Sequence, residues 1–216
     1  MRGHVKFIIG AIILAVLGGG VLMFSQARQS RATAPLEEIQ ESFASNAYAA
    51  DLGELVNGSA SFQGADLVIR GRATTAVNRQ VPRPSLPTPE PGSRKFIPPN
   101  HDSWVDFTLE ISEVVLAGQA PPTAPIIVTT PGYQQDGKAY FMEGYRHLQI
   151  GQEYLLFLIQ RPDGRFEPVG PQGYLKVQGN KVEPLQLGLP AIEDLRGKPV
   201  EEVKQQVKAA NVPKRQ

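Results

Sequence analysis

Side chains that commonly catalyse reactions or bind metals are few in this chain of 216 residues, which has three histidines and no cysteine. The histidines are His4, His101 and His147, and neither His101 nor His147 has a second histidine close enough along the chain for a local metal pair. The absence of cysteine excludes a thiolate zinc site, an iron–sulfur cluster, a disulfide framework and a cysteine nucleophile. We therefore expect neither a bound metal nor a cofactor.

Residue patterns for nucleophilic or acid–base catalysis are also missing. The sequence has no Gly-x-Ser-x-Gly elbow and no glycine-rich loop that precedes a helix and cradles a phosphate. Glu110 and Glu113 lie three residues apart in a segment with strand periodicity, so they face opposite sides and make a poor acid–base pair. A position at the surface or at a strand end explains His147 more simply than catalysis does. The sequence thus predicts no catalytic residues and a protein that is not an enzyme.

A proline-rich segment, residues 81–99, is the first candidate for a binding surface. It contains seven prolines, and Arg83, Arg94, Lys95 and Phe96 lie among them as candidate contact residues. Because proline fixes φ and donates no amide, we expect this segment to run extended as a loop outside any sheet. Such a loop can present its side chains to a protein partner, and a surface loop without a partner is the alternative.

The second candidate surface is aromatic. Tyr133 and Tyr145 enclose a segment that also holds Tyr140 and Phe141. Aromatic faces can stack on sugar rings, whereas aromatic residues in strands and turns more often pack in the core or at its rim. Nucleic acid is not an expected partner, because 22 Lys plus Arg nearly balance 21 Asp plus Glu and leave no strong positive field.

An alternation of apolar and polar residues begins at Gly64 and predicts a mainly β domain over residues 64–189. In residues 104–116 the apolar positions alternate with polar ones, which is typical of a strand with one buried face. Residues 154–159 are apolar without alternation, as in a central strand buried on both faces. Further strands are expected at residues 67–77, 126–130, 174–177 and 181–185, with hairpin turns at Asp163–Gly164 and Gly179–Asn180.

Helices are expected on both sides of this domain. Pro35 and the acidic residues that follow it signal a helix start, and apolar spacing continues the pattern to Phe43. A second helical stripe includes Leu52 and Leu55. We therefore expect a helical stalk and linker over residues 28–63. Residues 190–216 are expected to form a C-terminal helix with a valine stripe that packs on the sheet, followed by a tail.

The first 27 residues are expected to be a membrane anchor or leader. Residues 7–24 form an apolar run of 18 residues, about the length of a membrane-spanning helix. Arg2 and Lys6 before the run favour a cytoplasmic N-terminus and an exported body. A single-pass anchor is our main hypothesis. Cleavage after Ala27 is an alternative that would give a secreted protein, and a buried soluble helix is another.

Three segments of the β domain carry a resemblance to known proteins: ADLVIRGR at residues 65–72, FTLEISEVVLAG at 107–118 and GQEYLLFL at 151–158. They resemble a group of uncharacterised bacterial exported proteins that look like the netrin-module and TIMP-like variety of OB-fold barrel. The resemblance covers roughly residues 64–189. It implies a small OB-like barrel of about five to six strands with flanking helices, in which the loop 81–99 joins the first two strands.

The same resemblance implies binding without catalysis. Metalloproteinase inhibitors of that group reach a catalytic zinc through an N-terminal cysteine and have disulfide-linked barrels, and neither feature can exist in this chain. No functional residue is therefore carried over. The sequence predicts a noncatalytic, extracytoplasmic domain that is held to the membrane by residues 7–24 and binds a protein partner. A carbohydrate or cell-wall binding module is the alternative, and an unrecognised hydrolase is the third hypothesis.

Overall fold

The computed structural model describes residues 37–41, 48–82, 101–123, 125–142, 145–186 and 188–211. The predicted membrane segment, residues 7–24, lies outside them, as do residues 83–100 of the proline-rich loop. No helix in the described part of the chain is long and apolar enough to cross a membrane.

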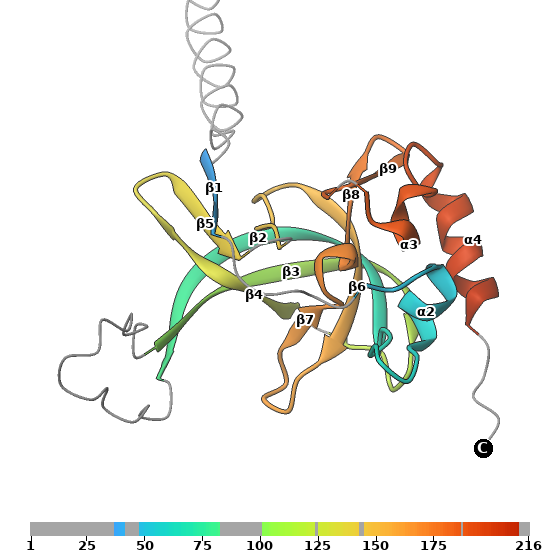
Figure 1. Cartoon of the computed structure of the whole chain (residues 1–216), viewed down its shortest axis with the longest axis horizontal. Coiled ribbons are helices and arrows are strands. Elements are labelled where there is room, and N and C mark those ends of the chain that lie inside the picture. Colours follow the sequence, from blue (N-terminus) through green and yellow to red (C-terminus); the bar gives the residue numbers. More distant parts are fainter. Residues whose placement is uncertain are drawn as a thin grey trace, which may run out of the picture. The chain divides into compact units, whose positions relative to one another are not determined.

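Five strands close into a barrel (Figure 1). They are β2 (Leu67–Pro82), β3 (His101–Ala117), β4 (Ile126–Gln135), β6 (Glu153–Gln160) and β7 (Phe166–Pro168). β2 pairs antiparallel with β3 and β6, and β3 pairs antiparallel with β4. The short β7 closes the ring, because it pairs parallel with β4 and antiparallel with β6. The predicted mainly β barrel is thus confirmed.

Further strands and helices extend this barrel. β4 continues through β5 (Lys138–Met142) to β1 (Glu37–Glu41), and β6 continues through β8 (Tyr174–Gln178) to β9 (Lys181–Pro184). A 3-10 helix, η1 (Pro171–Gly173), links β7 to β8. Three short helices, α2 (Leu52–Asn57), α3 (Pro190–Glu193) and α4 (Val200–Ala210), lie together beside the β6–β8–β9 part of the sheet (Figure 1).

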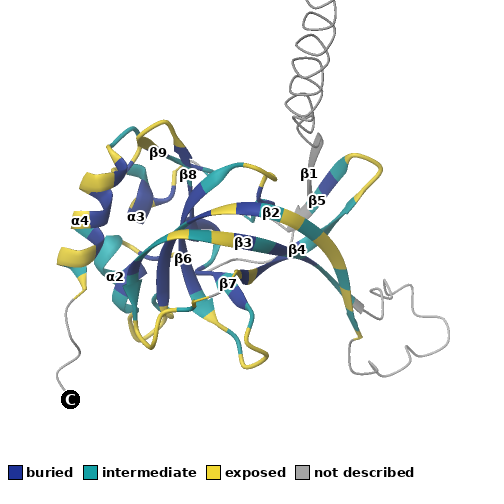
Figure 2. Ribbon diagram, turned by 180° about the vertical axis from the view of Figure 1, so that it is seen from behind, coloured by how far each residue is buried: buried dark blue, intermediate teal, exposed yellow. Residues whose placement is uncertain are grey.

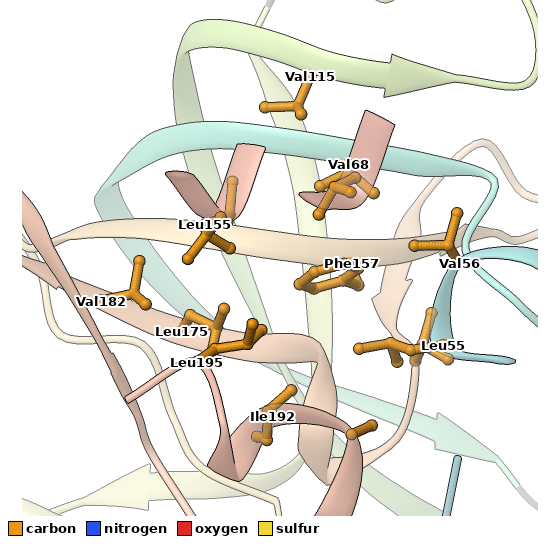
Figure 3. Packing of buried hydrophobic residues seen from close by; sticks show 14 of the residues in the cluster. Leu55, Val56, Val68, Val115, Leu155, Phe157, Leu175, Val182, Ile192 and Leu195 are labelled. Carbon is orange, nitrogen blue, oxygen red and sulfur yellow. The ribbon is translucent and has the colours of Figure 1, made fainter. Parts of the chain in front are cut away.

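The strand β6 belongs to two hydrophobic clusters at once. Tyr154, Leu156 and Leu158 enter the barrel interior, whereas Leu155 and Phe157 point out of the barrel toward the helices, and all five are fully buried. Figure 3 shows Leu155 and Phe157 among side chains from α2, α3 and β8. The unbroken apolar run of this strand follows from its two buried faces, as predicted.

Local sequence signals explain several other elements. Val105, Phe107 and Leu109 of β3 are fully buried, while the residues between them are partly exposed, so the predicted alternation is confirmed. Gly164 in the β6–β7 turn has φ of 81°, a left-handed conformation that glycine adopts without strain. Helix α2 begins after Asp51, whose carboxylate accepts a hydrogen bond from the Glu54 amide at 2.8 Å.

The proline-rich segment does not lie wholly outside the sheet as expected, because Val81 and Pro82 are the last two residues of β2 and pair with Asp102 and His101 of β3. Two further expectations were wrong. The helix expected from Pro35 is instead a strand, β1, which pairs in parallel with β5 and sets Glu37 opposite Lys138. The acidic residues there are weak helix signals, and the open edge of β5 offers backbone hydrogen bonds that outweigh them. The second error concerns His147, which is 4% exposed rather than at the surface, because the segment around it packs into the barrel interior.

Candidate functional site

The outer side of β3 that faces away from the helices carries the most distinctive set of polar side chains. Because Val105 and Phe107 point into the barrel, Trp104 and Asp106 point outward. The neighbouring strand β2 sets Arg79 opposite Trp104 and Val77 opposite Asp106. Val77 is 62% exposed. Figure 2 shows teal and yellow residues, partly exposed and exposed, along this part of β2 and β3.

Asp106 is the centre of an ion-pair network on this side. Its Oδ2 atom accepts hydrogen bonds from Nε of Arg79 at 2.9 Å and from Nε of Arg165 at 3.1 Å. Arg79 also donates from Nη2 to the hydroxyl of Thr129 on β4 at 3.1 Å, and Arg165 donates from Nη1 to Asp163 at 2.9 Å. Two arginines, one from β2 and one from the β6–β7 turn, are therefore held by one carboxylate of β3.

A third arginine joins the group through Trp104. The guanidinium carbon of Arg161 lies 5.4 Å from the centre of the Trp104 ring, a cation–π geometry, and Arg161 also pairs with Glu167 of β7. We call these seven residues the arginine–tryptophan face: Arg79, Trp104, Asp106, Thr129, Arg161, Arg165 and Glu167.

Charge pairing fixes the protonation states around the β6–β7 turn. The hydrogen bond to Asp163, and then the charge of Asp106, raise the pKa of Arg165. The backbone amide of Arg165, followed by its guanidinium, lowers the pKa of Asp163. Both groups stay ionised at neutral pH, so this part of the face is a fixed arrangement of donors and acceptors.

A groove of about 590 Å³ adjoins the arginine–tryptophan face. One wall is formed by described residues of the β3–β4 connection, within 117–123 and at Pro125, and the other by the β6–β7 turn, residues 160–166. Both segments project from the same end of the barrel (Figure 1). Asp163 and Arg165 line the groove, and Arg165 also contacts Asp106, so the groove and the face form one continuous surface.

This surface combines planar cationic donors, carboxylate acceptors, an indole ring and apolar side chains. Among the described residues, no three His, Asp or Glu side chains gather as a possible metal site. The carboxylates of Asp106, Asp163 and Glu167 are each paired with arginine. Ionised, paired carboxylates accept hydrogen bonds well and are poor proton donors at neutral pH.

Of the six contact residues predicted from sequence, the structure describes two, Tyr133 and Tyr145. Arg83, Arg94, Lys95 and Phe96 lie outside the described residues. Tyr133 is on β4, where its ring stacks on that of Tyr140 with centroids 4.5 Å apart and planes 8° apart.

Two further residues that the sequence singled out are held in or against the barrel interior. Tyr145 packs against the interior cluster, and burial raises its pKa to about 12. The His147 ring lies 5.9 Å from that of Phe107, its Nε2 is 3.4 Å from the Pro131 carbonyl oxygen, and burial lowers its pKa to about 4. His147 is thus buried, whereas Tyr145 is partly exposed.

The arginine–tryptophan face was not predicted from the sequence. One available signal was the alternation in β3, which turns Trp104 and Asp106 outward. Another was the predicted hairpin turn at Asp163–Gly164, which is flanked by Arg161 and Arg165. Neither signal reveals that the two turn arginines meet β3.

Comparison with known proteins adds no family to this description: no protein-family model matches the sequence, and no curated protein matches it significantly.

Proposed function

We propose that this chain is a noncatalytic binding module that captures a protein partner through the arginine–tryptophan face. The observation that carries the proposal is the network in which Asp106 holds Arg79 and Arg165 beside the Arg161–Trp104 pair. Arginine and tryptophan are among the residues that contribute most to protein–protein binding energy. Holding them in place before binding reduces the conformational entropy that association costs.

The barrel type supports this location. Counted along the chain, the five barrel strands are arranged first, second, third, fifth and fourth, and the third and fifth are parallel. We infer an OB-type barrel, of which TIMP-like and netrin modules are one variety. OB-folds bind ligands on the face of their second and third strands and on the loops after the first and fourth strands. Here those elements are β3, β4, the loop 83–100 and the β6–β7 turn.

Membrane attachment is a further part of the proposal. It is supported by the apolar run of residues 7–24 and by the basic residues before it. In this arrangement the barrel lies on the outer side of the membrane, where a binding module meets envelope or extracellular proteins. A reporter enzyme fused to the C-terminus, active only outside the cytosol, tests the orientation.

Carbohydrate or cell-wall binding is the second candidate function. The stacked pair of Tyr133 and Tyr140 favours it, because the outer face of a stacked aromatic pair on a hairpin can pack against a sugar ring. Replacement of Tyr140 by Ala with a soluble glycan as ligand tests this candidate. Tyr145 is unsuitable for the test, because it packs against the barrel interior.

Site-specific photocrosslinking in intact cells tests protein binding. A photoreactive amino acid at Val77 lies beside the arginine–tryptophan face, and the same amino acid at the exposed Gln205 of α4 is the matched control on the helix side. We expect a discrete protein adduct at Val77, none at Gln205, and loss of the adduct when Trp104 is also replaced by Ala. Equal adducts at both positions, or adducts with lipid alone, would refute the proposal.

A further inference from the structure

We propose that the groove beside the arginine–tryptophan face binds an extended peptide segment of the partner, with one basic side chain flanked by apolar ones. This inference rests on the proposed function, since it names the part of a protein partner that is recognised. The groove is open to solvent, lies between two walls of chain and has about 590 Å³ of space.

The lining of the groove supplies apolar contacts. The accessible apolar surface comes from Ile127 at the start of β4 and from Pro122 and Pro125 on the loop side. Leu67, Ile126 and Phe166 also line the groove but are buried. Ile127 is 40% exposed, the largest exposure of any big apolar side chain in the lining. An apolar side chain of a bound segment that covers Ile127 removes this surface from water.

The loop wall also offers backbone groups. No backbone hydrogen bond joins residues 119–123 to another described residue. The amides of Gln119, Ala120 and Thr123 are thus not bonded to the backbone of another described residue, while Pro121 and Pro122 have no amide to offer. An extended peptide presents its own amides and carbonyls along its length and can pair with these groups as an added strand does.

The negative charge of the groove favours a basic side chain in the bound peptide. Asp66 has no ion pair within the described residues, and its Oδ2 atom accepts only the backbone amide of Gln160 at 2.9 Å. Asp163 is paired with Arg165, but that guanidinium is shared with Asp106. The lining thus has two carboxylates against one cation whose charge is already divided. A lysine or arginine of the partner compensates the excess negative charge.

The same features disfavour other occupants. Phosphate groups of a nucleic acid or a lipid are repelled by Asp66 and Asp163. A sugar ring has no aromatic face to stack on, because the single aromatic residue in the lining, Phe166, is 8% exposed. An extended peptide is the occupant that uses the apolar lining, the backbone groups and the charge together.

Binding of short synthetic peptides to the full chain in detergent tests this inference by fluorescence polarisation. The probes are fluorescein-labelled Ala-Val-Lys-Val-Ala and two versions in which Gln or Glu replaces Lys. We expect the Lys peptide to bind about tenfold more tightly than the Glu peptide. The variants Asp66→Asn and Asp163→Asn keep the acceptor oxygens that hold Gln160 and the β6–β7 turn, so the fold is retained while one charge is removed.

We expect each Asn variant to weaken the preference for Lys and the double variant to abolish it, whereas Glu202→Gln on α4, the matched charge removal, leaves it unchanged. Equal affinities for the three peptides, a preference that survives in the double variant, or no binding at millimolar peptide would each overturn the inference. If the Val77 crosslink persists in that case, the proposed function stands and only the peptide assignment fails. If peptides bind but the crosslink is absent, protein capture through the arginine–tryptophan face fails.

Discussion

The two outer sides of this barrel differ in what covers them: helices pack on one side, and charged, partly exposed side chains lie on the other. On the helix side, β2, β6 and β8 point Val68, Phe157 and Leu175 outward, and these side chains are fully buried in a cluster that includes residues of α2, α3 and α4. On the other side, β2, β3 and β4 point Arg79, Asp106 and Ile127 outward, and no described helix packs over them. One side is thus buried by apolar packing, while the other is partly exposed to solvent and its side chains are held by ion pairs.

The two sides therefore have different roles, the helix side in stability and the open side in the proposed recognition. Apolar burial is the main favourable term in folding, so the helix side is expected to contribute strongly to stability. Partly exposed ion pairs contribute little to stability, because water competes for both partners. A network of this kind is better explained by the geometry that it imposes on Arg79, Arg161, Arg165 and Trp104 than by the folding energy that it provides.

The largest expected effect comes from truncating one aromatic residue on each side. Phe157 is fully buried, so Phe157→Ala should destabilise the chain by about 3–5 kcal/mol through lost burial and the cavity left behind. Trp104 lies on the open side and is partly exposed, so Trp104→Ala should cost about 1 kcal/mol of stability or less. Urea unfolding of both variants measures the contrast. A larger loss for Trp104→Ala would reverse the roles assigned to the two sides.

Acid is expected to act on the barrel interior, where the buried His147 ring lies 5.9 Å from that of Phe107. The folded-state pKa of His147 is lowered to about 4, below the ordinary value of 6.5, because protonation would bury a charge. The unfolded chain therefore binds the proton first, and stability that is complete above pH 6.5 is lost as the pH falls toward 4. The shift corresponds to about 3 kcal/mol.

Unfolding free energies at pH 7, 5.5 and 4 measure this loss. His147→Gln is the control, since it removes the titrating group and should remove its share of the pH dependence. An unchanged slope in the variant would show that His147 is not buried in its neutral form.

A smaller effect is expected at the ion pair that joins α4 to β3. The Nζ atom of Lys204 on α4 lies 2.6 Å from Glu113 on β3 and 2.8 Å from Glu201, and the lysine side chain is 7% exposed. Lys204→Met should cost about 1–2 kcal/mol, less than a fully buried pair would, because both carboxylates reach solvent. A double-mutant cycle with Glu113→Gln isolates the pair, and zero coupling energy would mean that it does not hold α4 to β3.

The smallest change in stability is expected in the groove. Ile127→Ser replaces a side chain that is 40% exposed, so the unfolding free energy should change by about 0.5 kcal/mol or less. Binding of the Lys peptide should nevertheless weaken several-fold, because the exposed apolar surface is lost. Thermal unfolding and fluorescence polarisation on the same preparation separate the two effects. A large loss of stability with unchanged binding would make Ile127 a core residue instead.

The fold was more predictable than the site. Strong local patterns marked β3 and β6, because alternation and an unbroken apolar run reflect how many faces of a strand are buried. β1 was mistaken for a helix because its pairing depends on β5, about a hundred residues away, which no local pattern contains. The burial of His147 was missed for a similar reason, since its neighbours in the barrel interior come from distant strands.

The arginine–tryptophan face was not predictable before the strands were paired. Arg79 and Asp106 are 27 positions apart, and Asp106 and Arg165 are 59 apart. Sequence alone identifies each of them as a polar residue at an outward position. Only closure of the barrel through β7 brings the β6–β7 turn beside β3 and makes one network of three arginines.

The central claim is that a partner covers the arginine–tryptophan face in the cell. Cysteine accessibility in intact cells tests this claim most directly. The chain has no cysteine, so Val77→Cys and Gln205→Cys each introduce a unique thiol, one on each side of the barrel. We predict that a membrane-impermeant maleimide labels both thiols rapidly in the purified chain. In cells it should label Gln205→Cys rapidly and Val77→Cys slowly, because a partner covers that side. Equally rapid labelling of both thiols in cells would contradict the account, and labelling of neither would contradict the proposed orientation.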